Sequence, residues 1–451
     1  MTQNNLAFTE NELIPEGYKK TEVGIIPNDW GVESLQNLCR SSITYGIVQC
    51  GPHIPNGIPY IRVSDMNSSE LNVDEMLRTS PEIASSFGRS KVEDGDIVYA
   101  LRGKLGEVKM VGAAVSGANL TQGTARIAPK NNIDNRYLLW TLRSPQALKQ
   151  AVKEAKGSTF VEITLGNLKG IGVPLPSSKE EQQKIATALS ETDALISELE
   201  KLIEKKQAIK TATMQQLLIG KTRFPEFALR EDGTPKAYKE SDLGQIPEDW
   251  GIFEINEVVE NIIDYRGRTP RKLGMDWGGG NIVALSAGNV KKGYIDFDAE
   301  CYLGSELLYK KWMRNGEAQK DDIAFTMEAP LGNVALIPDY SKYILSQRTI
   351  LLQINRQEFD PHFVFHVLMS NEFEKYISDQ ATGSTAQGIK RSLFEKLKLV
   401  LPIKLAEQKS ISQILDDFDF EIEKLNQKLN KLQLIKQGMM QELLTGKTRL
   451  V

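Results

Sequence analysis

The sequence carries one succession of motifs twice, and this duplication constrains the fold more than any other feature. Residues 220–223 (Gly-Lys-Thr-Arg) recur at 446–449, and Trp30, within the pattern Ile-Pro-x-Asp-Trp, recurs as Trp250. A repeat at such a spacing predicts two copies of one structural unit. The chain therefore divides into a domain, a long segment, a second domain and a second long segment.

Each long segment has apolar residues at alternating spacings of three and four, which predicts a helix with one apolar seam. The second seam runs from Ile411 to Leu443, whereas the polar residues Thr192, Lys206 and Thr213 interrupt the first. Helices of this length measure ~60 Å at ~1.5 Å per residue. Each seam needs a partner, and the simplest partner for each helix is the other helix.

The connections between the copies predict the direction of the helices. A domain of ~150 residues is about 40 Å across, so it cannot comfortably join helix ends that lie ~60 Å apart. We therefore expect an α+β fold in which two tandemly repeated α/β domains are separated by two long helices that form an antiparallel coiled coil, pseudo-twofold and nearly circular. The expected boundaries are 1–177 for the first domain, with 1–12 flexible, 178–222 for the first helix, 223–403 for the second domain and 404–451 for the second helix.

Composition excludes several classes of protein. The three cysteines, Cys39, Cys50 and Cys301, are scattered, which suits a reducing cytosol and gives no metal-ligand spacing. No apolar run reaches transmembrane length, and the N-terminus lacks a signal-peptide pattern, so we expect a cytoplasmic protein. The net charge of −4 weakens a nucleic-acid function without excluding it, because local basic patches bind phosphates whatever the total charge.

No motif predicts catalysis or a cofactor. Each Gly-Lys-Thr triplet follows a helix, and Gln215 and Gln441 stand where a phosphate-binding loop needs glycine, so a helix C-terminal cap is the favoured interpretation. His362 and His366 have the spacing of metal ligands, but the first copy has no histidine at the equivalent positions and no third ligand is evident. Methyltransferase signatures are absent. We expect no catalytic, metal-binding or cofactor-binding residue in this chain.

Where matching loops of the two copies carry different residues, each copy could recognise a different target. Arg and Lys reach guanine O6 and N7, while Asn and Gln pair with adenine; a solvated surface group is the alternative for each. The candidates for DNA contact in the first domain are Tyr45, Gln49, Asn56, Arg62, Arg102 and Lys104. The candidates in the second domain are Arg266, Arg268, Thr269, Arg271 and Lys272.

Residues identical in both copies serve something that both domains share. Trp30 and Trp250 are interpreted as core anchors. The shared candidates for DNA contact are Gln122, Gln347, Ser158, Thr159, Ser384 and Thr385. The last four belong to Gly-Ser-Thr triplets, for which a plain turn and a phosphate contact are equally good interpretations.

The order and duplication of these motifs resemble the specificity subunit of type I DNA restriction–modification systems. The resemblance rests on the Ile-Pro-x-Asp-Trp segments, the Pro-x4-Glu-Gln helix starts at Pro176 and Pro402, and the Leu-Leu-x-Gly-Lys-Thr-Arg helix ends, and it covers nearly the whole chain. It implies two target recognition domains that each read one half of a split site in double-stranded DNA. The coiled coil would set the gap and bind two adenine methyltransferase subunits.

The same resemblance implies what the partners supply. The methyltransferase subunits would bind S-adenosylmethionine, and restriction translocase–nuclease subunits, with ATP and Mg, would join for cleavage. This chain would be a non-catalytic, nucleoid-associated protein. Two alternatives stay open: a DNA-binding adaptor of another methylation-based defence system, and a structural spacer that binds two proteins and no DNA.

Overall fold

The computed structural model describes residues 14–68, 70–155, 161–383 and 387–450. They fall within two compact units, residues 1–200 with 427–451 and residues 201–426. Each unit contains one globular domain and part of each long helix, α5 (Lys179–Leu217) and α12 (Leu405–Leu443). The prediction of flexibility for residues 1–12 concerns a segment outside the described residues. None of the described helices is both long and apolar enough to cross a membrane.

The first unit is built from short strands and helices. Its strands are β1 (Tyr18–Thr21), β2 (Gly24–Pro27), β3 (Gly31–Ser34), β4 (Thr44–Tyr45), β5 (Ile58–Ile61), β6 (Arg78–Thr79), β7 (Ile97–Ala100), β8 (Val108–Met110), β9 (Asn119–Leu120), β10 (Thr124–Ile127) and β11 (Gly172–Leu175). Its shorter helices are α1 (Pro81–Ser86), α2 (Asn135–Leu142), α3 (Pro145–Lys153) and α4 (Leu165–Lys169). The main sheet has the order β4-β10-β7-β8, and smaller sheets have the orders β6-β5-β9, β1-β2 and β3-β11.

The main sheet of the first unit is buried on both faces. On β7, Ile97 and Tyr99 belong to one hydrophobic cluster, with residues of α2 and α4, while Val98 and Ala100 belong to another, with residues of β5 and β9. Successive side chains of a strand point to opposite faces, so the continuous apolar run of β7 fits a strand between two cores.

The second unit repeats this topology. Its strands are β12 (Tyr238–Ser241), β13 (Gly244–Pro247), β14 (Trp250–Glu254), β15 (Val259–Asp264), β16 (Ile282–Leu285), β17 (Leu303–Gly304), β18 (Ile323–Met327), β19 (Leu331–Leu336), β20 (Tyr343–Leu345), β21 (Thr349–Ile354) and β22 (Lys398–Pro402). Its shorter helices are α6 (Pro225–Ala228), α7 (Ile255–Val258), α8 (Glu306–Trp312), α9 (Pro361–Met369), α10 (Asn371–Gln380) and α11 (Arg391–Phe394).

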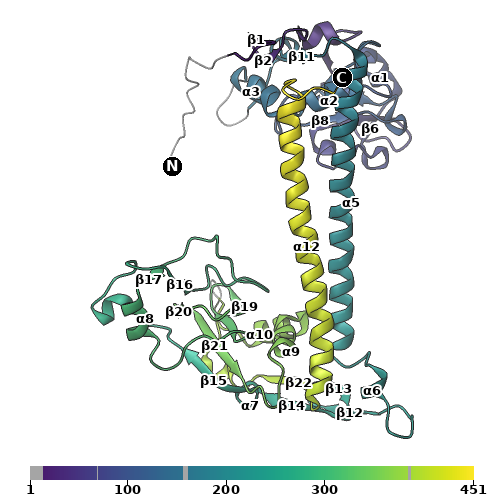
Figure 1. The fold of residues 1–451 in the computed structure, drawn as a ribbon. Helices are drawn as coiled ribbons and strands as arrows, with labels where there is room; N and C mark the ends of the chain where they lie inside the picture. Colours follow the sequence, from purple (N-terminus) through teal and green to yellow (C-terminus); the bar gives the residue numbers. More distant parts are fainter. Residues whose placement is uncertain (1–13, 69, 156–160, 384–386, 451) are drawn as a thin grey trace. The chain divides into compact units, whose positions relative to one another are not determined.

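The sheets of the second unit, β15-β21-β18-β19, β17-β16-β20, β12-β13 and β14-β22, match those of the first strand for strand. In Figure 1, α9 and α10 lie beside the main sheet of this unit. The predicted duplication of an α/β domain is therefore confirmed.

Within each unit the two long helices run in opposite directions (Figure 1). In the first unit Asp193 pairs with Lys436 at 2.7 Å. In the second unit Lys206 pairs with Glu421 at 2.8 Å. Lys210 lies one turn further along α5, and its partner Asp419 precedes Glu421 on α12. The predicted antiparallel pairing is confirmed by these contacts.

The repeated motifs of the first unit meet at one junction, where the end of α12 returns to the first domain. Arg449 bonds Glu181 at the start of α5 through Nε at 2.5 Å and Nη2 at 2.9 Å. Trp30, 1% exposed, donates from Nε1 to Glu181 at 3.3 Å. Gly446 ends the helix at φ +72°, and a Cβ there would lie 2.6 Å from Pro27. The predicted C-terminal cap and core anchor are both confirmed.

The second unit has an equivalent junction, although Nε1 of its tryptophan, Trp250, has no hydrogen-bond partner among the described residues. Arg223 bonds Asp249 at 2.8 and 2.9 Å and Glu407 at 2.7 and 2.8 Å. Gly220, at φ +69°, would bring a Cβ to 2.5 Å from Pro247, and Trp250 is fully buried. The residues shared by both copies thus serve to dock each domain on the helix ends.

Where each domain packs on a long helix, the two units use different chemistry. In the first, Trp140 on α2 donates to Ser190 on α5 at 2.9 Å. In the second, Asp416 on α12 lies 2.7 Å from His362 and 2.8 Å from His366, both on α9. The His pair is therefore a packing contact between helices. Among the described residues, no group of three or more His, Cys, Asp or Glu is placed to hold a metal.

Candidate functional site

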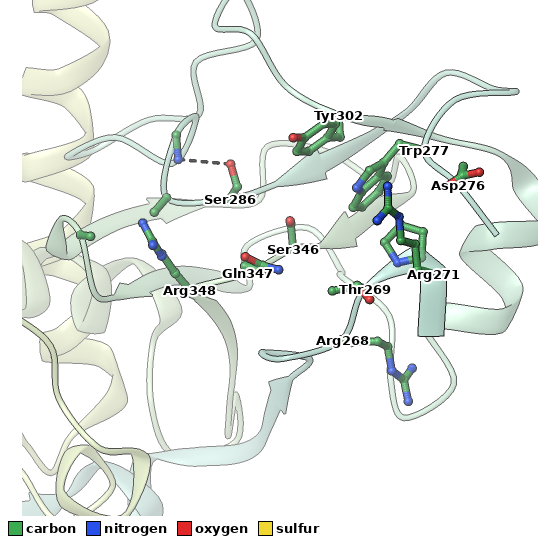
Figure 2. A pocket seen from close by; sticks show the side chains of 14 residues that line it. Arg268, Thr269, Arg271, Asp276, Trp277, Ser286, Tyr302, Ser346, Gln347 and Arg348 are labelled. Atoms are coloured by element: carbon green, nitrogen blue, oxygen red, sulfur yellow. Dashed lines mark hydrogen bonds between the residues drawn. The ribbon is translucent and has the colours of Figure 1, made fainter. Parts of the chain in front are cut away.

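The second domain has a cavity of about 710 Å³ at one edge of its two larger sheets. Its wall comes from the loops that follow β15, β16, β18 and β20, together with the segment before β17 (Figure 2). The lining residues are Arg268, Thr269, Pro270, Arg271, Asp276, Trp277, Ser286, Ala287, Gly288, Tyr302, Ala329, Ser346, Gln347 and Arg348. Loops at the ends of strands hold these side chains, while the buried sheets fix the loops.

Two aromatic rings form one wall of this cavity (Figure 2). Trp277 stacks on Tyr302 with ring centroids 5.1 Å apart and planes 9° apart, and it also contacts the buried Trp312 at 5.4 Å. Tyr302 is 61% exposed. The stack therefore presents an open aromatic surface beside charged groups, a combination suited to nucleic acid.

The three arginines of the loop that follows β15 differ in the contacts that their guanidinium groups already make within the protein. Arg266 donates to both carboxylate oxygens of Asp264, at distances from 2.6 to 3.1 Å. Arg268 donates to the Trp312 carbonyl and lies over the Tyr265 ring at 4.9 Å. Among the residues that the structure describes, no ion pair or side-chain hydrogen bond engages Arg271, which is exposed. Arg271 is thus the arginine of this run that is free to bind a ligand.

Burial alone would raise the pKa of Asp264, but the hydrogen bonds from Arg266 outweigh it and leave that pKa lowered. Asp264 is therefore ionised at neutral pH and holds Arg266 in a structural ion pair.

The first domain has an equivalent cavity, also of about 710 Å³. Its lining residues are Ile47, Val48, Cys50, Arg62, Val63, Ser64, Arg102, Gly103, Thr121, Gln122, Gly123 and Glu162. Backbone hydrogen bonds establish the equivalence. Thr121 N donates to Ile61 O at 3.1 Å, as Ser346 N donates to Leu285 O at 2.7 Å. The two cavities thus share a backbone frame and differ in side chains.

Two arginines line the first cavity. Arg62 donates to Asp65 through Nε at 3.1 Å and Nη2 at 2.6 Å, and the carboxylate also accepts from the Arg62 backbone. Arg102 lies against Gln122, whose amide oxygen, when turned toward the guanidinium, is 3.2 Å from both of its terminal nitrogens. Arg62 is held by its own turn, whereas Arg102 is exposed and contacts a neutral group.

The structure separates the predicted contact residues into three groups. The predicted residues that line the cavities are Arg62, Arg102, Gln122, Arg268, Thr269, Arg271 and Gln347. Those outside the cavity walls are Tyr45, Gln49, Asn56, Lys104, Arg266 and Lys272. Ser158, Thr159, Ser384 and Thr385 lie outside the described residues.

Sequence reasoning missed several lining residues, among them Trp277, Tyr302, Ser346 and Arg348. One signal was available for Arg348. It directly follows the shared Gln347, where the first copy has Gly123 after Gln122, so the two copies differ in side-chain size and charge directly beside an identical residue. The aromatic pair had no such signal, because the two rings come from separate loops.

Known proteins resemble this chain along most of its length. The profile of the family described as "Type I restriction modification DNA specificity domain" matches residues 27–211 and 247–434. A Methanocaldococcus jannaschii protein assigned as the MjaX specificity subunit of a type I restriction enzyme is 28% identical over 446 residues, 96% of this chain and 97% of that protein. The EcoBI specificity subunit of Escherichia coli is 30% identical over 222 residues, 48% of this chain and 45% of that subunit.

Solved structures share the fold. A crystal structure of a type I restriction–modification S subunit from M. genitalium superposes with a TM-score of 0.58 at 16% identity, covering 92% of this chain and 96% of that one. A chain from a structure on complex assembly and conformational transition of the type I R-M system has a TM-score of 0.52 at 14% identity and covers 94% of this chain and 99% of its own length.

Proposed function

Because the chain belongs to the type I restriction–modification DNA specificity family, we propose that it selects the DNA sequence on which a type I restriction–modification complex acts. Each globular domain reads one half of a bipartite target. The paired helices set the gap between the halves and bind two methyltransferase subunits. The proposed boundaries are 1–177 and 223–403 for the recognition domains, with helices at 178–222 and 404–451.

One observation supports this function above the others. The two domains carry cavities on the same backbone frame with different polar linings. An enzyme with two active sites would repeat its catalytic residues, whereas a reader of two different half-sites needs a repeated frame and varied contacts. Exposed arginines beside Gln122 or Gln347 supply the donors that base edges and phosphates accept.

The partners supply the chemistry in this proposal. Methyltransferase subunits bind S-adenosylmethionine and methylate adenine, and translocase–nuclease subunits bring ATP and Mg for restriction. This chain binds neither nucleotide nor metal by itself and contributes no catalytic residue. Calorimetry on the partner-free protein should detect no binding of ATP or S-adenosylmethionine, and tight binding of either would overturn this part of the proposal.

The deciding experiment is to sequence the methylated bases of a host with and without this gene. We expect a bipartite motif with a fixed gap that disappears on deletion and returns with the gene. Reconstitution with an adenine methyltransferase, followed by DNA binding at several salt concentrations, then tests direct recognition. A complex that assembles but shows no sequence preference would favour the structural spacer, and assembly with a different effector would favour an adaptor of another defence system.

A further inference from the structure

Two neighbouring positions carry one arginine in each domain, but at different places: one position lies on the cavity wall in both domains, and the other lies on the wall in the first domain and directly before wall residue Ala329 in the second. Leu101 N donates to Gly123 O at 2.9 Å in the first domain, and Met327 N donates to Arg348 O at 2.8 Å in the second. In both domains, therefore, the residue that follows the backbone N–H donor lies near the residue whose carbonyl accepts the bond. Arg102 corresponds to Glu328, and Gly123 corresponds to Arg348.

The two arginines occupy the space between these positions from opposite sides. A Cβ on Gly123 would lie 3.2 Å from Nε of Arg102, so the absence of a side chain at 123 makes room for Arg102. In the second domain Arg348 comes from the other position, and its Nε lies 3.3 Å from Oε1 of Glu328. Each cavity thus presents a guanidinium at this place, although different strand ends supply it.

The backbone of Arg348 gives an independent reason to regard it as functional. Its φ is +70°, in the left-handed region that favours glycine, and the adjacent wall residue Ala329 has φ +43°. Strained residues of this kind persist where the side chain is needed and cluster at binding sites. The cavity keeps an arginine where glycine would fit without strain.

The neighbouring carboxylate defines what the pair can recognise. In the major groove one G·C pair presents the acceptors N7 and O6 on guanine and the N4 amino donor on cytosine. A guanidinium fork fits the first two and a carboxylate fits the third. The Arg348 and Glu328 side chains are 50% and 53% exposed, and an ion pair this open is weak, so both groups can exchange partners for a base pair.

We propose that Arg348 and Glu328 read one G·C base pair in one half-site, and that Arg102 beside Gln122 reads a guanine in the other. Arg348, Arg102 and Gln122 line the two cavities, and Glu328 contacts Arg348 from beside the wall; we assign these four as specificity-determining residues. The inference rests on the proposed function, because it assigns the bases that the two recognition domains distinguish.

The test uses the complex assembled with its methyltransferase subunits and duplexes that carry every single base-pair change in both half-sites. Arg348→Gly removes the guanidinium and places glycine in the left-handed conformation, so we expect a thermal midpoint at or above that of the parent. We expect discrimination for a G·C pair to fall roughly ten- to hundred-fold at one position of one half-site, with the other half-site unchanged. Arg102→Ala should relax one guanine in the other half-site.

A swap tests the equivalence of the two positions. Glu328→Arg with Arg348→Gly rebuilds the first-domain arrangement in the second domain and should restore the preference for guanine. Arg102→Glu with Gly123→Arg is the reverse swap in the first domain. Arg314→Ala, which removes an exposed arginine outside the cavity wall, is the matched control and should leave all base preferences unchanged.

Different failures have different meanings. Unchanged base preferences in Arg348→Gly would overturn the assignment while wild-type recognition, and with it the proposed function, stands. An equal loss of affinity for all duplexes, with the slope of log binding constant against log salt concentration smaller by about 1, would overturn the assignment in favour of a phosphate contact. A parent complex without any sequence preference would overturn the proposed function itself.

Discussion

Arg449 donates hydrogen bonds from both terminal guanidinium N–H groups to the carboxylate of Asp29, at 2.9 Å each, although the two residues are 420 positions apart in the chain. Hydrogen bonds with Glu181 and Asp29 raise the pKa of Arg449, and the bond from Arg449 lowers the pKa of Asp29. The first domain and the end of α12 are therefore joined by a charge-assisted contact at any pH near neutrality.

Arg449→Ala should destabilise the first unit by ~1–3 kcal/mol, because it leaves the buried Glu181 carboxylate without its cation. Hydrogen exchange should accelerate at residues 24–27 and 443–450. The equivalent residues of the second unit, 217–224 and 244–247, should keep their protection. Lys447→Ala, which removes a neighbouring exposed cation, serves as control, and equal acceleration in both variants would show that the junction does not depend on Arg449.

The contact of α9 with α12 should depend on pH. The hydrogen bond to Asp416 raises the pKa of His362. Burial would raise the pKa of Asp416, but hydrogen bonds from His362 and His366 lower it to about 2. A histidine whose folded pKa is raised stabilises the fold below its unfolded pKa of ~6.5, and this stability is lost as pH rises through the folded value. The Asp416 contribution is present above its unfolded pKa and is lost only as pH falls through about 2.

We therefore expect the second unit to lose stability as pH rises above ~6.5, measured by hydrogen exchange of α9. His362 and Asp416 are each about one-third exposed, so solvent screening limits the effect. Asp321 and Asp360 also raise the pKa of His362. Asp416→Asn should remove most of the dependence. The first unit, with Trp140 and Ser190 at this contact, is the internal control, and an equal pH effect there would contradict the assignment.

Arg271→Ala and Arg266→Ala should have different effects, although the two residues belong to one basic run. Arg271 is exposed on the cavity wall, so its loss should weaken or alter recognition of one half-site by ~1–3 kcal/mol. Arg266 is bound to Asp264, so its loss should leave base preferences alone and loosen the loop. Competition among single-substitution duplexes measures both. A position-specific change in Arg266→Ala would contradict its structural role, and a uniform loss in Arg271→Ala would make Arg271 a phosphate contact.

Shortening both long helices by one heptad should shorten the gap between half-sites and leave the half-sites unchanged. One heptad is ~10.5 Å of helix, about three base pairs at ~3.4 Å each. Deleting residues 196–202 and 422–428 together preserves the phase of the apolar seams. Because three base pairs also rotate the duplex, activity should fall, and the methylation that remains reports the gap. A folded, active variant with the original gap would show that the helices do not set it.

Much of this architecture was predictable because it depends on local patterns that the chain repeats. The apolar seams predict α5 and α12, and the positions of Gly220 and Gly446 predict their ends. The duplication predicts two copies of one domain, and chain connectivity predicts antiparallel helices. The buried tryptophans follow from the same repeat, since a residue kept in both copies serves what both copies share.

Tertiary structure decided which polar residues are available. Arg266 and Arg271 belong to one basic run, and the structure shows that the Asp264 carboxylate engages Arg266 and leaves Arg271 free. The repeat aligns Gly123 with Arg348, but strand pairing is what places these residues beside Arg102 and Glu328. Sequence pattern determines helices and strands because their periodicity is local. A binding surface depends on distances between side chains from separate loops, and these distances exist only once the sheets have brought the loops together.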